Sequence, residues 1–271
     1  MHFELMWLSY PILGLFAGFL AGLMGVGGGT ILVPALAEIF AHSAIDPSQR
    51  MHLALGTSMA IIVFTALSSA RAHHAKGAIL WPVVASMTPG VLLGTFSNTW
   101  VAAQIPSEPL MLFFAFFLIL IALQMFLGLR PQTQRPLPGK VGLFCAAWGI
   151  GGVSSLVAIG GGSLIVPFLT WCKVEVRQAI GSSAALGFPI ALAGALGYMV
   201  NGWGATHLPT GAAGYVYLPA LVLVASTSVL IAPFGARVAH RVPVARLKKM
   251  FAGLLFLIAL KMLWSLWHAA A

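Results

Sequence analysis

The chain has 271 residues, of which 60% are hydrophobic and only 7% are charged, and its mean hydropathy is +0.98. A soluble domain carries about 25% charged residues, so this composition excludes a soluble globular protein and indicates an integral membrane protein. The formal net charge of +9 gives no reason to expect a nucleic-acid partner, because most of the basic residues lie in a few short loops, where they report membrane orientation.

The first apolar segment covers residues 5–41, which is too long for one membrane span and too short for two spans with a loop. A run of three glycines interrupts it, and each glycine in a helix interior costs about 1 kcal/mol relative to alanine. We therefore predict a hairpin of two short helices that enters the membrane and returns to the side from which it started.

Three ordinary spans follow, at residues 52–70, 79–98 and 109–129, each with the roughly 20 apolar residues that a bilayer requires. With the hairpin they form a predicted unit of residues 1–130. The linker at 131–140 contains basic residues and is predicted to be cytoplasmic.

The second half, residues 141–271, repeats this order. A second glycine-interrupted hairpin is predicted at 141–172, and further spans at 179–200, 214–236 and 250–267. Three full crossings are an odd number, so the second unit runs opposite to the first, as in secondary transporters with inverted repeats. The predicted fold is an all-α polytopic membrane protein of two inverted repeats, each a broken-helix hairpin plus three transmembrane helices.

Charge placement sets the predicted orientation. Basic residues gather in the loops 71–78, 130–140, 173–178 and 237–249, which we therefore place in the cytoplasm. Both termini are then outside. In the alternative, each hairpin crosses the membrane once, and two of these basic loops fall on opposite sides.

Inverted repeats bring one broken helix in from each face, so the two glycine runs are expected to meet near the bilayer midplane. Irregular backbone is tolerated there only where protein or water satisfies its polar groups. Free N–H groups and the positive ends of the two short helices suit a small anion. The predicted substrate-binding residues are Gly27, Gly28, Gly29, Thr30, Gly160, Gly161, Gly162 and Ser163. The alternative is close backbone packing with no ligand.

Four further hydroxyl residues, Thr57, Ser58, Ser182 and Ser183, stand near the starts of the spans 52–70 and 179–200. We expect them to complete the site, the alternative being helix–helix contact or hydrogen bonding to their own helix.

Gln124 and Lys261 occupy equivalent positions near the ends of the last span of each half. An intramembrane lysine is a candidate for gating or substrate contact, although Lys261 also lies close enough to the C-terminus to snorkel to the outer interface. Glu38, near the end of a short predicted helix, is the one weak candidate for a proton relay. The cysteines, Cys145 and Cys172, show no ligand pattern, so we expect no metal site and no cofactor.

Several motifs resemble those of the TauE/SafE family of sulfite and organosulfonate exporters. They are GVGGGTILVPAL at 25–36, AIGGGSLIVPFL at 158–169, ALGTS at 54–58, AIGSS at 179–183, HHAKGAI at 73–79 and PGVLLG at 89–94. The second glycine motif departs mildly, with Ala158 in place of the leading glycine. The resemblance implies outward transport of small sulfur-containing anions, such as sulfite, thiosulfate or sulfoacetate, across the bacterial inner membrane, and it is compatible with a homodimer.

The favoured function is therefore a secondary transporter that exports such an anion by alternating access. The alternatives are an anion channel and a membrane assembly or scaffold protein without solute flux. We expect no enzyme, because the sequence shows no nucleophile–base pair or metal cluster.

Overall fold

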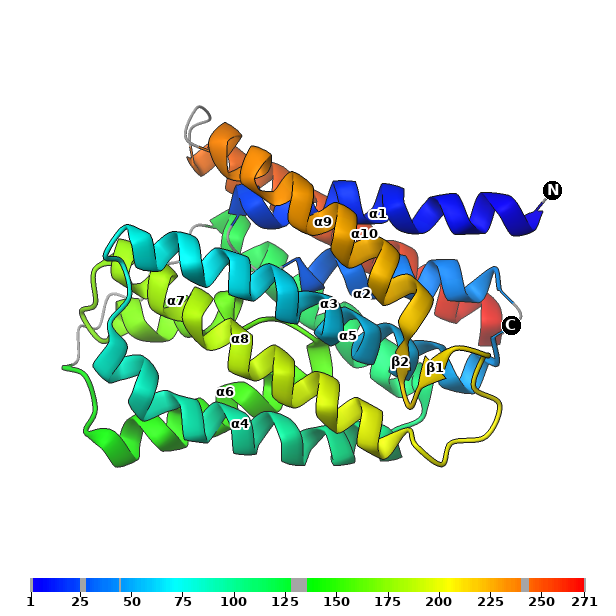
Figure 1. Ribbon diagram of the computed structural model, residues 1–271, viewed down its shortest axis with the longest axis horizontal. Helices are drawn as coiled ribbons and strands as arrows, with labels where there is room; N and C mark the ends of the chain where they lie inside the picture. Colours follow the sequence, from blue (N-terminus) through cyan, green and yellow to red (C-terminus); the bar gives the residue numbers. More distant parts are fainter. Residues whose placement is uncertain (1, 25–27, 44, 128–135, 240–243, 271) are drawn as a thin grey trace.

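The computed structural model describes residues 2–24, 28–43, 45–127, 136–239 and 244–270. The described part of the first half folds into five helices, with short connections (Figure 1). They are α1 (His2–Met24), α2 (Gly29–Ala41), α3 (Pro47–Ala75), α4 (Trp81–Gln104) and α5 (Ser107–Leu127).

The described part of the second half adds five helices and one short β-hairpin. They are α6 (Lys140–Val157), α7 (Gly162–Trp171), α8 (Val176–Asn201), β1 (Ala212–Ala213), β2 (Val216–Tyr217), α9 (Leu218–Ala239) and α10 (Val244–Ala270). The two strands pair antiparallel. The prediction of an all-α polytopic membrane protein is confirmed, whereas the division into two inverted repeats at 131–140 stays a prediction.

Within the described ranges, five helical segments are long and apolar enough to cross a membrane. They are Pro47–Ala75, Ser107–Leu127, Lys140–Val157, Val176–Asn201 and Lys249–His268. Two of the differences between expected and observed helix starts have a local cause. Helix α3 begins at Pro47, because the Asp46 carboxylate accepts hydrogen bonds from the Ser48 backbone N–H (2.8 Å) and hydroxyl (2.7 Å). These bonds also hold the pKa of Asp46 below its ordinary value. Helix α9 begins at Leu218, because the β-hairpin occupies the residues before it.

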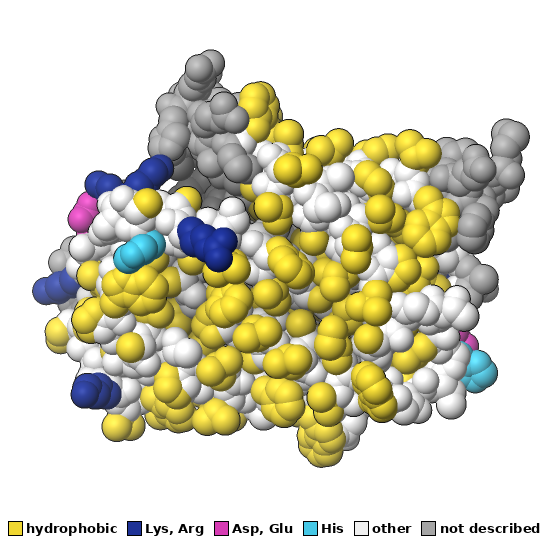
Figure 2. Space-filling model, in the orientation of Figure 1, with side chains coloured by type: hydrophobic (Ala, Val, Ile, Leu, Met, Phe, Trp, Pro, Cys, Tyr) yellow, Lys and Arg dark blue, Asp and Glu magenta, His cyan; other side chains and the backbone are white. Residues whose placement is uncertain are grey.

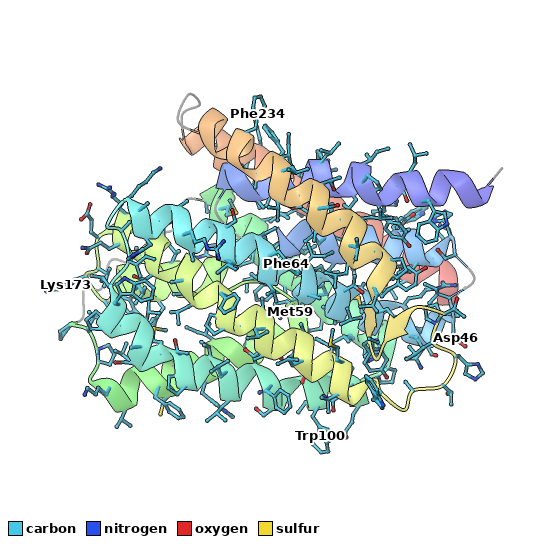
Figure 3. The ribbon with its side chains drawn as sticks, in the orientation of Figure 1. Asp46, Met59, Phe64, Trp100, Lys173 and Phe234 are labelled. Atoms are coloured by element: carbon cyan, nitrogen blue, oxygen red, sulfur yellow. The ribbon has the colours of Figure 1, made fainter. Side chains whose placement is uncertain are left out.

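Helices α3 and α8 pack against each other in the centre and are the most buried of these spans. Helix α1 packs against α9, and α6 packs against α4, so each half contributes its first helix to a partner in the other half. Helices α5 and α10 form a further pair. Trp100 and Phe234 lie at the outer edges of the molecule, while Met59 lies in its interior (Figure 3).

The two ends of the molecule differ in charge. The N- and C-termini lie at one end, and the α3–α4 and α7–α8 connections lie at the other (Figure 1). Lys and Arg side chains gather at the end with these connections, while hydrophobic side chains cover the face between the ends (Figure 2). Asp46 and Lys173 mark the opposite ends (Figure 3). The arrangement agrees with the segregation of basic loops, and the assignment of sides stays a prediction.

Glycines bring the paired helices together. A Cβ atom at Gly94 of α4 would overlap the carbonyl oxygen of Trp148 in α6, and one at Gly14 of α1 would lie 2.6 Å from the carbonyl oxygen of Val224 in α9. Where two backbones approach this closely, only a residue without a side chain fits.

We expect Gly94→Ala to destabilise the protein by about 1–3 kcal/mol, because its methyl group has to displace a neighbouring backbone. Gly149→Ala is the matched control, since nothing lies within 4 Å of its added Cβ atom. That change should leave stability unchanged or raise it. Thermal unfolding of both variants in one detergent measures the difference, and equal unfolding temperatures would contradict the packing interpretation.

Candidate functional site

The first glycine run breaks the chain between α1 and α2. Gly28 has φ +77°, a left-handed conformation that glycine adopts without strain. Its carbonyl oxygen accepts hydrogen bonds from the N–H groups of Ile31 (3.1 Å) and Leu32 (3.0 Å). No side chain caps this helix start, so the first N–H groups of α2 lack intrahelical acceptors. Gly27 lies outside the described residues.

The second run gives the same local structure between α6 and α7. Gly161 has φ +81°, and its carbonyl oxygen accepts hydrogen bonds from the N–H groups of Leu164 (3.1 Å) and Ile165 (2.7 Å). Helix α7 also begins without a side-chain cap. Each short helix therefore starts with backbone donors that the helix itself does not satisfy, at the positive end of its dipole.

The two breaks touch. A Cβ atom at Gly29 would overlap the carbonyl oxygen of Ala158, which ends α6. Ile62 of α3 lies against both, because its methyl carbons would be 2.9 Å from a Cβ atom at Gly29 and 3.1 Å from one at Gly160. We call this contact the glycine junction. The described residues of the two glycine runs thus lie close together, as expected.

Helix α8 contributes another wall of the junction. A Cβ atom at Gly187 would lie 2.7 Å from the carbonyl oxygen of Gly160. Ser183 stands four residues before Gly187, and Ser58 stands four residues before Ile62, so each serine shares a helix face with a residue that contacts the junction. The two central helices run antiparallel, since a Cβ atom at Gly194 of α8 would lie 3.0 Å from the Met59 side chain of α3 and one at Gly187 would lie 3.6 Å from the Ala66 side chain. Ser58 and Ser183 therefore lie about one helical turn from the junction, on opposite sides of it.

The motifs ALGTS and AIGSS hold neighbouring segments in place. The Thr57 hydroxyl accepts a hydrogen bond from the backbone N–H of Tyr217 (2.9 Å), just before α9. The Ser182 hydroxyl accepts one from the backbone N–H of Leu80 (2.9 Å), just before α4. These structural partners favour the helix-contact alternative for Thr57 and Ser182 over a ligand role.

Three of the predicted site hydroxyls have no partner. Among the described residues, the buried side-chain oxygens of Thr30, Ser58 and Ser183 make no hydrogen bond, and these side chains are at most 2% exposed. A buried polar group left unpaired costs about 1–3 kcal/mol. Thr30 next to the junction, and Ser58 and Ser183 to either side of it, therefore present hydroxyls that are available to an additional acceptor.

Lys261 and Gln124 are not brought together. The Lys261 ammonium lies 2.9 Å from the Glu38 carboxylate, which joins α10 to α2, whereas Gln124 lies partly buried on α5. Both Lys261 and Glu38 line a separate cavity of about 650 Å³. The sequence placed both residues near the outer end, but their pairing depends on how α2 and α10 pack. In the described part of the chain, no three His, Cys, Asp or Glu residues are grouped to hold a metal ion.

Comparison with known proteins identifies the family. Residues 10–262 match the family model described as sulfite exporter TauE/SafE. The chain belongs to this family. The resemblance drawn from the glycine motifs is confirmed.

Curated relatives carry transporter names. A probable membrane transporter protein of Haemophilus influenzae is 37% identical over 256 residues, which cover 93% of this chain and 96% of the relative. One of Methanocaldococcus jannaschii is 28% identical over 93% of both chains, and one of Bacillus subtilis is 28% identical over 70% of this chain and 77% of the relative. No solved structure matches the chain. This TauE/SafE protein is a membrane transporter.

The neighbouring hydroxyls Thr57 and Ser58 should respond differently to removal. We expect Thr57→Val to lower the free energy of unfolding by about 1–3 kcal/mol, because the buried N–H of Tyr217 loses its acceptor. Ser58→Ala should leave stability unchanged or raise it, because it removes an unpaired buried group. Thermal unfolding compares the two variants, and an equal loss in both would show that Ser58 has a structural partner.

Proposed function

We propose that this TauE/SafE protein is a secondary transporter that exports a small sulfur-containing anion. The candidate substrates are organosulfonates such as sulfoacetate, and sulfite or thiosulfate, and the proposed binding site is the glycine junction. One observation carries the proposal: two interrupted helices touch at Gly29 and Ala158, beside the unpartnered hydroxyl of Thr30, and the unpartnered hydroxyls of Ser58 and Ser183 flank this contact on α3 and α8.

The available groups at the junction are donors. The first N–H groups of α2 and α7 and the Thr30 hydroxyl can all donate to oxygen atoms, and two helix dipoles add positive potential. Neither glycine run contains a lysine or arginine, so an anion would be held by neutral donors. A sulfonate or sulfite presents three oxygen acceptors, which suits such a set.

Burial of the junction favours a carrier over a channel. Thr30 and Ser58 are fully buried, and Ile62 fills the space against both glycine runs. A solute can reach these hydroxyls only after helices move. The reciprocal packing of α1 on α9 and of α6 on α4 supports alternating access, in which equivalent movements of two inverted repeats open the site to either side.

The proposed setting is the bacterial inner membrane, with both termini outside and residues 131–140 in the cytoplasm. A potential of about 100 mV, negative inside, is worth roughly 2.3 kcal/mol for each negative charge that leaves. A dianion would gain about 4.6 kcal/mol, enough for a gradient of about a thousandfold. Export therefore needs no coupled ion, and we assign the protein no catalytic reaction.

Flux into proteoliposomes tests the proposal. We expect uptake of labelled sulfoacetate or thiosulfate, but not of acetate, and its rate should follow an imposed membrane potential. The double variant Ser58→Ala and Ser183→Ala should reduce this uptake at least about tenfold, because the anion loses a hydroxyl donor on each side of the junction. The matched control is Ser97→Ala, whose exposed hydroxyl bonds only within its own helix.

The alternatives make different predictions in the same vesicles. A carrier exchanges labelled for unlabelled substrate against a gradient, whereas an anion channel does not. An assembly or scaffold protein shows no flux with any of these anions, although variants at the junction still alter folding or partner binding. Uptake that is equal in the double variant and in wild type would remove the glycine junction from the mechanism.

A further inference from the structure

A cavity of about 650 Å³ lies along α2, which we call the α2 cavity. Helices α1, α3, α5 and α10 complete its walls. Its volume is within the range of about 300–1,000 Å³ that is usual for small-molecule sites. The proposed transport mechanism makes no use of it.

The α2 cavity contains four charged side chains, two of each sign: Arg50, Lys261, Glu38 and Glu108. Lys261 pairs with Glu38 at 2.9 Å, while the Arg50 side chain donates a hydrogen bond to the Ile45 carbonyl oxygen at 3.1 Å. Because these charges balance, a simple anion or cation would leave one of them uncompensated. A ligand with both charges could exchange partners with the Lys261–Glu38 pair and preserve neutrality.

The rest of the cavity wall is mainly apolar and faces the bilayer on one side. Ile12 and Phe16 of α1 line the cavity and are 59% and 49% exposed, and Ile258 of α10 lines it as well. Exposed apolar side chains on a membrane-spanning protein contact lipid chains. An occupant can therefore enter from the membrane, with its hydrocarbon part on these residues.

We propose that the α2 cavity binds an aminophospholipid. Its phosphate would bind Lys261 and Arg50, its ammonium group would bind Glu38 and Glu108, and an acyl chain would lie against the apolar wall. Phosphatidylcholine lacks N–H donors for the two carboxylates, and phosphatidylglycerol lacks the ammonium group altogether. Charge and hydrogen bonding together thus select phosphatidylethanolamine among common lipids.

Bound lipid would also contact the helix that carries one of the glycine runs. The cavity face of α2 extends from Glu38 to Ile31, and the Ile31 N–H bonds to the Gly28 carbonyl oxygen. The lipid would therefore stabilise one position of α2 next to the glycine junction.

Native mass spectrometry of the full chain, released from bilayers with equal amounts of phosphatidylethanolamine, phosphatidylcholine and phosphatidylglycerol, tests this proposal. We expect phosphatidylethanolamine to be retained about tenfold over the other two lipids, since charge-assisted hydrogen bonds are worth about 1.5–3 kcal/mol each. Lys261→Met should lower the amount of phosphatidylethanolamine retained, because the phosphate loses one of its two basic partners. Lys249→Met is the matched control, because Lys249 is an exposed lysine on the same helix, 6.0 Å from the Phe126 ring and outside the cavity.

A second variant covers the case in which Lys261→Met fails to fold. Glu38→Gln keeps the volume of the side chain but removes one of the two ammonium partners, so the preference for phosphatidylethanolamine over phosphatidylcholine should fall. Equal retention of all three lipids by the wild type, a preference for phosphatidylglycerol, or a preference that Glu38→Gln leaves undiminished would overturn the proposal. Displacement of the lipid by soluble glycerophosphoethanolamine at equal concentration would also overturn it, because the acyl chain would then contribute nothing.

Discussion

The contact between the backbone at Gly29 and the carbonyl oxygen of Ala158 is the constraint on which the rest of the structure depends. Two helices stop inside the molecule, and their ends must be enclosed by protein because lipid cannot satisfy backbone donors and acceptors. The left-handed glycines Gly28 and Gly161 allow the backbone to reverse direction sharply at each break. The small neighbouring residues let the two turns touch. Helices α3 and α8 then enclose the junction from its sides.

Helices α3 and α8 also hold the surrounding segments in place, and in each helix two adjacent residues have different roles. In α3, a Cβ atom at Gly56 would overlap the Tyr215 carbonyl oxygen, so this glycine admits the segment that Thr57 then binds. Gly181 and Ser182 of α8 do the same for Ala78 and Leu80. The serine that follows in each motif points elsewhere, because successive helix residues are about 100° apart, and it is left without a partner.

The length of the apolar segments and their glycine runs made most of the helices predictable, since bilayer thickness and helix propensity act on local sequence. The β-hairpin before α9 was not predicted, because its two-residue strands leave no periodic pattern. The partners of Thr57 and Ser182 and the pairing of Lys261 with Glu38 depend on contacts between distant segments, which composition and spacing do not specify. Of the predicted hydroxyl site, Thr30, Ser58 and Ser183 keep the features expected of ligand contacts.

The unpaired hydroxyls connect this conformation to the proposed transport. Burying Thr30, Ser58 and Ser183 without acceptors costs about 1–3 kcal/mol for each group, so the closed arrangement forms against an opposing free energy. An oxyanion that accepts from Thr30 at the junction, or from a serine beside it, would remove part of that cost. Substrate binding then favours the closed conformation over open ones by as much as its affinity differs between them. A carrier needs this property, because the closed state is the intermediate through which a bound solute passes from one side to the other.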